Sequence, residues 1–304
     1  MTTKKPAPPK KPTRKPTAAF NWRLTVFFLI FLLISGVILW KFWHSTHPGG
    51  PAVNPLPLPT NPETFARQVT KDEKNLIFAG VPKAAKSMPE PHILRNRGYV
   101  AGYSEQRENP LWVSYRLDHT NAVSAPPRPK KFTVDSRTQS RVRQDDYKNS
   151  GYDRGHMAPN HGIALRYGNE GQLETFFMSN IVPQRPELNR KLWVRLERLE
   201  NEFADSFEQL WVMTGPIFDR NRETMDSGVE IPDAFYKIFV DENNGQFRML
   251  SFIIPQNVHG NEKIQSFFAS VDQVEEASGF DFFWALTDPF ENRIEEQKAS
   301  ALWR

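Results

Sequence analysis

The sequence contains no cysteine, which excludes disulfide bonds, thiol nucleophiles and cysteine-based zinc sites. It shows no internal repeat, so repeat architectures are excluded as well. Acidic residues are absent from the first 41 positions, which carry eight Lys or Arg. The rest of the chain holds 31 basic and 35 acidic residues, a net charge of −4. The overall charge of +4 therefore comes from the N-terminal tail, and it is no evidence that the body binds nucleic acid.

One long apolar run stands close to the N-terminus. Residues 24–40 are 17 uncharged and mostly apolar residues, and Phe42 and Trp43 extend the run beyond Lys41. This length is near the lower limit for a bilayer-spanning helix, it is long for a signal-peptide core, and no small-residue cleavage site follows. We predict an uncleaved transmembrane anchor at residues 24–43, with a cleaved signal peptide as the alternative.

The basic residues before the anchor predict the orientation of the chain. Residues 1–23 are expected to form a basic cytoplasmic tail, because positive flanks stay on the cytoplasmic side. The single-pass anchor then leaves everything after residue 43 on the extracytoplasmic side, in a periplasm or outside the cell. Residues 44–62 contain six prolines and predict an extended, semi-rigid stalk.

Residues 63–304 have the composition of one globular domain, and their patterns predict both strands and helices. Apolar alternation and β-branched residues favour strands at 99–103, 111–117, 176–182, 210–214, 234–240 and 247–254. Helical spacing favours helices at 186–203 and 262–278. Because strands outnumber helices without strict alternation, we expect an α+β domain with a mixed, largely antiparallel sheet and helices packed on it.

The stretch GYDRGHMAPN, residues 151–160, places an acid, an arginine, a glycine and a histidine in one row. It is expected to end a short strand, followed by a loop, the strand at 176–182 and the helix at 186–203. This order would bring His156 opposite Asn189 on the first turn of the helix. An imidazole can take a proton from water at neutral pH, and an amide oxygen suits Mg²⁺. The pair therefore predicts a base beside a metal.

These segments carry a family resemblance. DRGHMAPN, followed about 30 residues later by SNIVPQRPELNRKLWVRLE, resembles the DNA/RNA non-specific endonucleases, the ββα-metal family to which endonuclease G belongs. The resemblance extends from GYVAGYSEQRENPLWVSYRL before the motif to WVMTGPIFD, IPDAFYKIFV and SGFDFFWAL after it. It covers about residues 75–290, and it implies a ββα-metal active-site motif within the domain.

The resemblance implies roles for three residues around a metal ion. His156 matches the general base, and Asn189 matches the direct protein ligand of Mg²⁺ or Mn²⁺. Glu197 matches a glutamate that holds a metal-bound water. Asn189 and Glu197 would lie about 12 Å apart along a regular helix. The match of Glu197 therefore requires a long reach, a bridging water or an asparagine outside the regular turns.

The resemblance also implies charged residues around the scissile phosphate. Arg154 matches the arginine of the motif and could bind the phosphate, while Asp153 could orient local groups or a metal-bound water. The family uses a further upstream arginine, for which the candidates in RPKKF are Arg128, Lys130 and Lys131.

Together these features predict a membrane-anchored, Mg²⁺-dependent endonuclease that cleaves DNA and RNA without sequence preference. The alternatives are an inactive nucleic-acid receptor on the same fold and a phosphodiesterase for a small substrate. The resemblance also implies a homodimer, although no residue of the sequence marks an interface.

Overall fold

A seven-stranded antiparallel sheet forms the centre of the protein in the computed structural model, which describes residues 76–303 except 87, 123, 220 and 244–245. The strand order is β10-β9-β8-β7-β4-β3-β2. The strands are β2 (His92–Arg95), β3 (Val100–Ser104), β4 (Asn109–Asp118), β7 (Gln209–Ile217), β8 (Ala234–Asn243), β9 (Gln246–Pro255) and β10 (Phe268–Ala269). Two small antiparallel pairs accompany it: β1 (Lys83–Ala84) with β11 (Phe280–Asp281), and β5 (Asp153–His156) with β6 (Ile181–Gln184).

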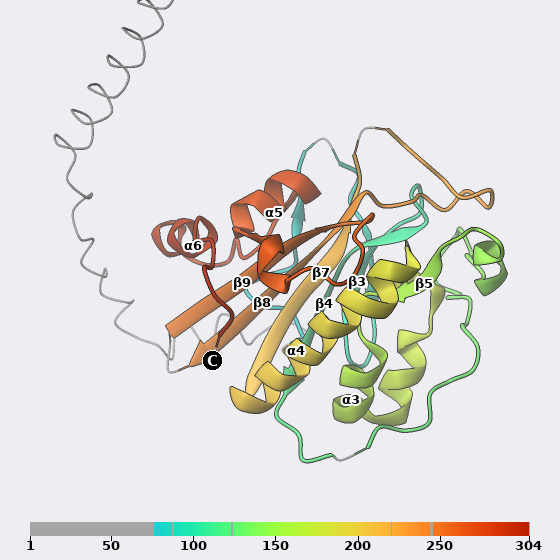
Figure 1. The fold of residues 1–304 in the computed structure, drawn as a ribbon. Helices are drawn as coiled ribbons and strands as arrows, with labels where there is room; N and C mark the ends of the chain where they lie inside the picture. The colour runs from blue at the N-terminus through green and yellow to red at the C-terminus, as the bar shows by residue number, and fades with distance from the viewer. Residues whose placement is uncertain (1–75, 87, 123, 220, 244–245, 304) are drawn as a thin grey trace, which may run out of the picture. The chain divides into compact units, whose positions relative to one another are not determined.

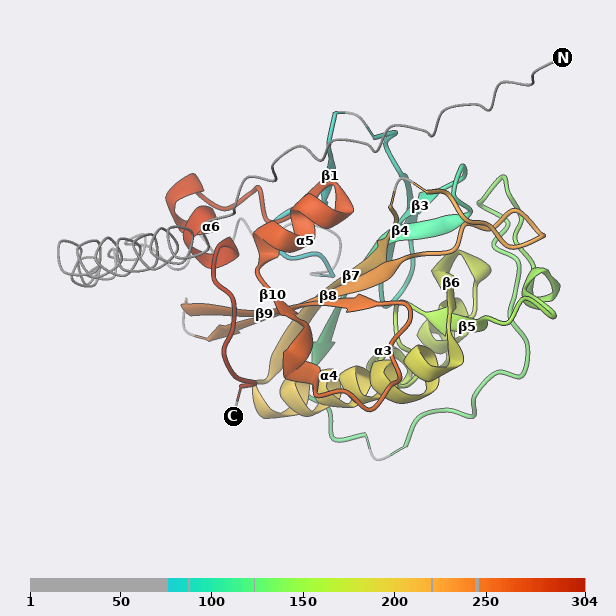
Figure 2. The ribbon, with the colours of Figure 1, turned by 45° about the horizontal axis from the view of Figure 1, so that its top comes forward.

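Helices cover both faces of this sheet. Helices α3 (Asn160–Thr175) and α4 (Val194–Ser206) lie on one face, and α5 (Val271–Ser278) and α6 (Asp288–Glu295) lie on the other (Figures 1 and 2). Short 3₁₀ turns occupy 144–147, 178–180 and 264–267. The domain therefore has three layers, and the predicted α+β class is confirmed. The main sheet is antiparallel throughout rather than mixed.

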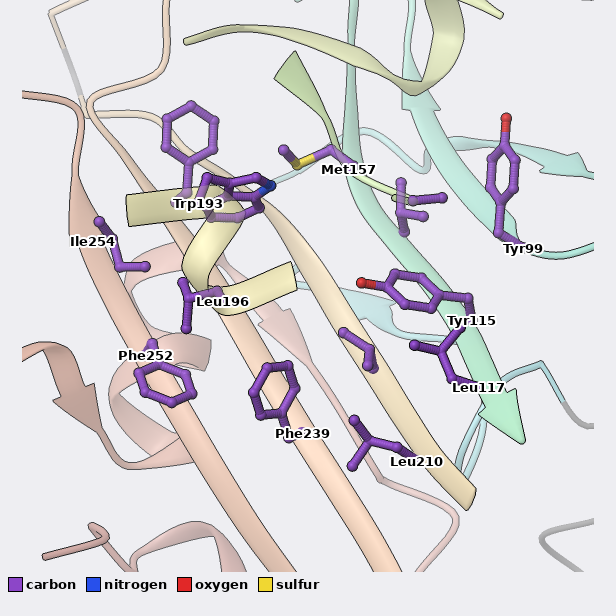
Figure 3. Close-up of a cluster of buried hydrophobic side chains, with 14 of the residues drawn as sticks. Tyr99, Tyr115, Leu117, Met157, Trp193, Leu196, Leu210, Phe239, Phe252 and Ile254 are labelled. Carbon is purple, nitrogen blue, oxygen red and sulfur yellow. The ribbon is translucent and has the colours of Figure 1, made fainter. Parts of the chain in front are cut away.

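Alternation along the strands gives each face of the sheet its own core. In β8, Phe235 and Phe239 pack in the cluster beneath α4, whereas Tyr236 and Ile238 pack in the cluster beneath α5. Figure 3 shows the first cluster, in which Trp193 and Leu196 stand over the strands. Two charged residues of β8 are also buried: Lys237, which follows Phe235 and precedes Phe239 on the same face, and Asp241.

The helix predicted at 186–203 is confirmed and continues to Ser206. Its apolar stripe is buried as the spacing indicates, with Leu188, Leu192 and Leu196 fully covered. The stretch Leu188–Trp193 is a π-helix rather than an α-helix. The predicted asparagine ligand therefore lies in a widened turn.

Three local predictions were wrong. The loop expected after the motif is helix α3, whose apolar residues form no continuous stripe and whose backbone is broken at Gly168, where φ is 70°. The strand expected at 176–182 begins only at Ile181, after a 3₁₀ turn. The helix expected at 262–278 begins only at Val271, because Ser270 caps it and Phe268–Ala269 pairs with β9.

The membrane predictions fall on a part of the chain that the structure does not describe. The basic tail (1–23), the anchor (24–43), the stalk (44–62) and the first residues of the predicted domain are outside the described ranges. From residue 76 onward, the described helices are all too short or too polar to cross a bilayer.

Candidate active site

The DRGH residues form strand β5, which pairs with β6 so that Asp153 lies opposite Gln184 and His156 opposite Ile181. The glycine of the motif has a steric reason. A Cβ atom at Gly155 would lie 2.1 Å from the side-chain oxygen of Gln184, so the buried Gln184 side chain occupies the space that a larger residue would need. The local packing thus requires glycine between the arginine and the histidine.

His156 is buried, with 7% of its surface exposed. Its ring packs against the rings of Phe132 and Phe176, with centroid distances of 5.4 and 5.0 Å, and these two rings also contact each other at 5.0 Å. Among the described residues, its buried Nε2 atom has no hydrogen-bond partner. Burial, reinforced by the charge of Arg128, lowers the pKa of His156 to about 3. The imidazole is therefore neutral at physiological pH, and no side chain or backbone group in the described ranges occupies its Nε2.

Asp153 fixes the orientation of Asn189. The Asn189 side-chain nitrogen donates a hydrogen bond to Asp153 Oδ2 at 3.0 Å, and Arg190 donates two more to the same carboxylate, at 2.7 and 2.6 Å. Burial would raise the pKa of Asp153, but the hydrogen bonds from Arg190 and Asn189 hold it below its ordinary value. Because the amide nitrogen is held by an ionised carboxylate, the amide oxygen is turned away and remains available as a ligand.

Asn189 and Glu197 lie in helical segments of different geometry. In a π-helix residue i is hydrogen-bonded to residue i+5, and short π-helices are frequent at functional sites. Asn189 lies inside the π-helix, whereas Glu197 lies in the regular helix α4. At the end of the π-helix, the Trp193 indole donates a hydrogen bond to the carbonyl oxygen of His156 at 3.2 Å. The start of the helix is thus attached to both ends of β5, through Asp153 and through His156.

A buried charged network lies behind Glu197. Lys237 Nζ donates to Glu200 Oε2 at 2.9 Å and to the Tyr115 hydroxyl at 3.0 Å, and the hydroxyl donates to the same carboxylate. The side chains of Lys237 and Glu200 are fully buried. Burial and the nearby Glu200 carboxylate raise the pKa of Glu197 to about 7, although Lys237 and Arg128 oppose the shift.

The predicted basic residues differ in what they contact and in which groups their charges affect. The guanidinium of Arg128 lies over the Phe176 ring at 5.0 Å, and its charge acts on both His156 and Glu197. Arg154 lies over Phe132 at 5.4 Å and donates to the Gln144 carbonyl at 2.9 Å. Lys130 and Lys131 are exposed and are not among the charges that shift either pKa. All three upstream candidates are exposed, and Arg128 is the one whose charge shifts these two pKa values.

Sequence reasoning missed the residues that support this group. Phe132 and Phe176 pack against the histidine, and Arg190 shares the Asp153 carboxylate with Asn189. Lys237 had a readable signal, because a lysine interrupts the apolar run AFYKIFV. The aromatic residues had none, since they belong to segments far from the motif in sequence.

Comparisons with known proteins identify the family of this chain. A family model described as DNA/RNA non-specific endonuclease matches residues 82–288. A mitochondrial nuclease EXOG of Danio rerio is 31% identical over 206 residues, which are 62% of this chain and 60% of that protein. Mitochondrial endonuclease G of Homo sapiens is 29% identical over 229 residues, 66% of this chain and 72% of the human protein.

A solved structure gives the same result for the fold. The chain resembles one in the crystal structure of an EndoG/EndoGI complex, with a TM-score of 0.59 and 27% sequence identity. The likeness covers 69% of this chain and 89% of that one. The match to the Danio rerio nuclease spans less than two thirds of that relative's length.

Proposed function

The chain belongs to the DNA/RNA non-specific endonuclease family, and from this premise we propose that it is a metal-dependent endonuclease that hydrolyses phosphodiester bonds of DNA and RNA. The observation that carries the proposal is the group around β5. It combines a neutral His156 with a free Nε2, a cationic Arg128 beside it, and an Asn189 whose amide oxygen is turned away from Asp153. A binding module has no use for a base in this position.

His156 accepts the proton of the attacking water in this proposal. Burial is the larger cause of the lowered pKa of His156, and the charge of Arg128 is the smaller one. A phosphate bound beside Arg128 would offset this second cause and raise the pKa toward the range in which a base works well. Arg128 and Arg154 stabilise the negative charge that grows on the phosphoryl oxygens during in-line attack. Backbone phosphates carry no base information, so cleavage is expected at many sequences.

The residues present fit a hard divalent cation, Mg²⁺ or Mn²⁺. The Asn189 amide oxygen is a hard donor held in one orientation by Asp153. Glu197 has a raised pKa, and a nearby cation would favour its ionised form. We propose Asn189 as the direct ligand and Glu197 as the residue that holds a metal-bound water. When bound, the ion would supply Lewis-acid stabilisation of the phosphoryl and leaving oxygens.

The two alternatives receive less support. A receptor on this fold would not need the histidine with its free nitrogen. A phosphodiesterase for a small substrate would need a closed pocket at the site. The structure has a cavity of about 680 Å³, but it is lined by Arg107, Phe218 and Arg222 and by none of the site residues.

Metal removal tests the proposal directly. The purified full-length protein is expected to nick and then linearise supercoiled plasmid, and to degrade RNA, with Mg²⁺, and to lose both activities in EDTA. Asn189→Ala should lower the rate at least about 100-fold at submillimolar Mg²⁺, because a ligand is removed. The matched variant Asn257→Ala, at an exposed position, should keep the wild-type rate. Binding without cleavage would establish the receptor alternative instead.

We further propose that residues 24–43 anchor the enzyme in a membrane with its catalytic domain on the extracytoplasmic side. The support is the uncharged apolar run after a basic tail. The protein should stay in the membrane fraction after carbonate extraction, and protease added to intact cells or spheroplasts should digest the domain. Release by carbonate, or a mitochondrial location like that named for the animal relatives, would contradict this topology.

The implied homodimer can be measured by light scattering.

A further inference from the structure

Three carboxylates converge on the face of the sheet opposite the candidate active site. Asp272 and Glu275 lie one turn apart on α5, and Glu295 is the last residue of α6. One oxygen atom from each lies within 4.8 Å of those of the other two. Helices α5 and α6 are neighbours in both ribbon views, away from α3 and α4 (Figures 1 and 2).

Glu295 distinguishes this group from an ordinary acidic surface. Only 5% of its surface is exposed, and its buried Oε1 atom has no hydrogen-bond partner in the described part of the chain. A buried carboxylate without a partner is costly unless a proton or a cation compensates it. Its place at the C-terminal end of α6 adds to the cost, because a helix C-terminus disfavours negative charge.

The surroundings make the group more negative rather than neutralising it. Asp281 and Glu291 lie close enough to raise the pKa values of the group further, and Lys83 is the cation facing these two. Burial, followed by Glu275, raises the pKa of Glu295 to about 9, and burial raises that of Glu275 to about 7. Protons would therefore be retained here at neutral pH, and a divalent cation could replace them.

The spacing suits one ion. Two oxygens that each bind the same ion at about 2.4 Å lie at most about 4.8 Å apart, and the three carboxylate oxygens meet this limit. Glu275 accepts a hydrogen bond from the Phe282 backbone at 2.7 Å through Oε1, which leaves its other oxygen free. Asp272 is exposed, so an ion and its waters can enter. We propose that Asp272, Glu275 and Glu295 bind a Ca²⁺ ion that joins α6 to α5.

Calcium fits this donor set better than magnesium. Ca²⁺ takes six to eight oxygen ligands in flexible geometry, whereas Mg²⁺ prefers an ideal octahedron and keeps several of its waters. The ion would have a structural role, because Phe290 and Ile294 pack α6 into the core beneath α5 and neither belongs to the catalytic group. This site is independent of the proposed function.

Thermal unfolding of the full-length protein tests the proposal. After treatment with EDTA and its removal, Ca²⁺ at a hundredfold excess over its dissociation constant should raise the unfolding midpoint by at least about 4 °C. Glu295→Gln should abolish the rise. This variant is expected to fold, because glutamine resembles the protonated glutamic acid that burial favours. In isothermal titration the wild type should bind one Ca²⁺ ion in addition to any ion held by Asn189. Asn189→Ala should therefore still bind one Ca²⁺ ion.

The matched control is Glu276→Gln, which makes the same substitution at an exposed position of α5 outside the group. It should keep the full calcium-dependent rise, and Glu295→Gln should keep Mg²⁺-dependent nuclease activity. If Ca²⁺ leaves the wild-type midpoint unchanged, the group does not bind the ion. If Ca²⁺ raises the midpoint of Glu295→Gln equally, the ion binds elsewhere. Either result would overturn the proposal.

Discussion

His156→Ala is expected to lower the rate of DNA and RNA cleavage by at least about 1,000-fold, since a positioned general base contributes about 10²–10⁴-fold. His156 packs against Phe132 and Phe176, and its buried Nε2 has no hydrogen-bond partner among the described residues. Single-turnover cleavage of a labelled duplex at saturating Mg²⁺ measures the chemical step. His156 accepts the hydrogen bond of Trp193 through its backbone carbonyl oxygen, so the substitution leaves that hydrogen bond in place.

His161→Ala is the matched control, because His161 is exposed on the first turn of α3, five residues along the chain. It should keep the wild-type rate. If His156→Ala retains more than about a tenth of the activity, the loss is far below that expected for a general base. The base would then have to be sought elsewhere.

His156→Ala should also change how the free energy of unfolding depends on pH in the acid range. The pKa of His156 is about 3 in the folded protein and 6.5 ordinarily, so the unfolded chain binds more protons between these values. Stability therefore falls as the pH decreases through this range, by about 1.4 kcal/mol per pH unit. His156→Ala removes this penalty. Urea unfolding at about pH 7 and about pH 4.5 measures the decrease in the free energy of unfolding between these pH values. In His156→Ala this decrease should be roughly 2–3 kcal/mol smaller than in the wild type.

Lys237→Met is expected to cause the largest loss of folding stability, about 3–5 kcal/mol, because it removes one partner of a buried ion pair. Lys237 and Glu200 are both fully buried, and Lys237 also lies 4.8 Å from the Trp193 ring. The variant leaves the Glu200 carboxylate without its cation. Urea unfolding followed by circular dichroism measures the change.

The pH dependence identifies the cause of this loss. Burial raises the pKa of Glu200, while Lys237 and Tyr115 oppose the shift. Without Lys237 the folded-state pKa rises further above the unfolded value, so stability is lost as the pH increases. The deficit of Lys237→Met should therefore be larger at pH 8 than at pH 5. An equal deficit at both values would indicate simple loss of packing.

Two further variants complete the comparison. Arg97→Met removes one partner of the exposed Arg97–Glu170 ion pair, whose side chains are 53% and 68% exposed, and should cost less than about 1 kcal/mol. The double variant Lys237→Met with Glu200→Leu should recover most of the stability, because replacing both partners removes the unpaired charge. Failure of the double variant to recover would assign the loss to packing.

Local chemistry made parts of this protein readable from sequence. The spacing of Leu188, Leu192 and Leu196 predicted the helix that carries Asn189 and Glu197. Alternating residues predicted the long strands, because the side-chain period of a strand is two. Helix α3 could not be predicted this way. Its weak pattern and its break at Gly168 leave tertiary contacts to decide its conformation.

The sequence by itself determined the residue types of the site, since the DRGH motif is followed along the chain by Asn189 and Glu197. Only the tertiary structure decided how they act together. It placed Arg128 rather than its lysine neighbours near His156, put Asn189 in a π-turn, and buried Lys237 with Glu200 behind Glu197. The physical reason is that burial and charge–charge interactions depend on distances between segments far apart in the chain, and no local pattern records those distances.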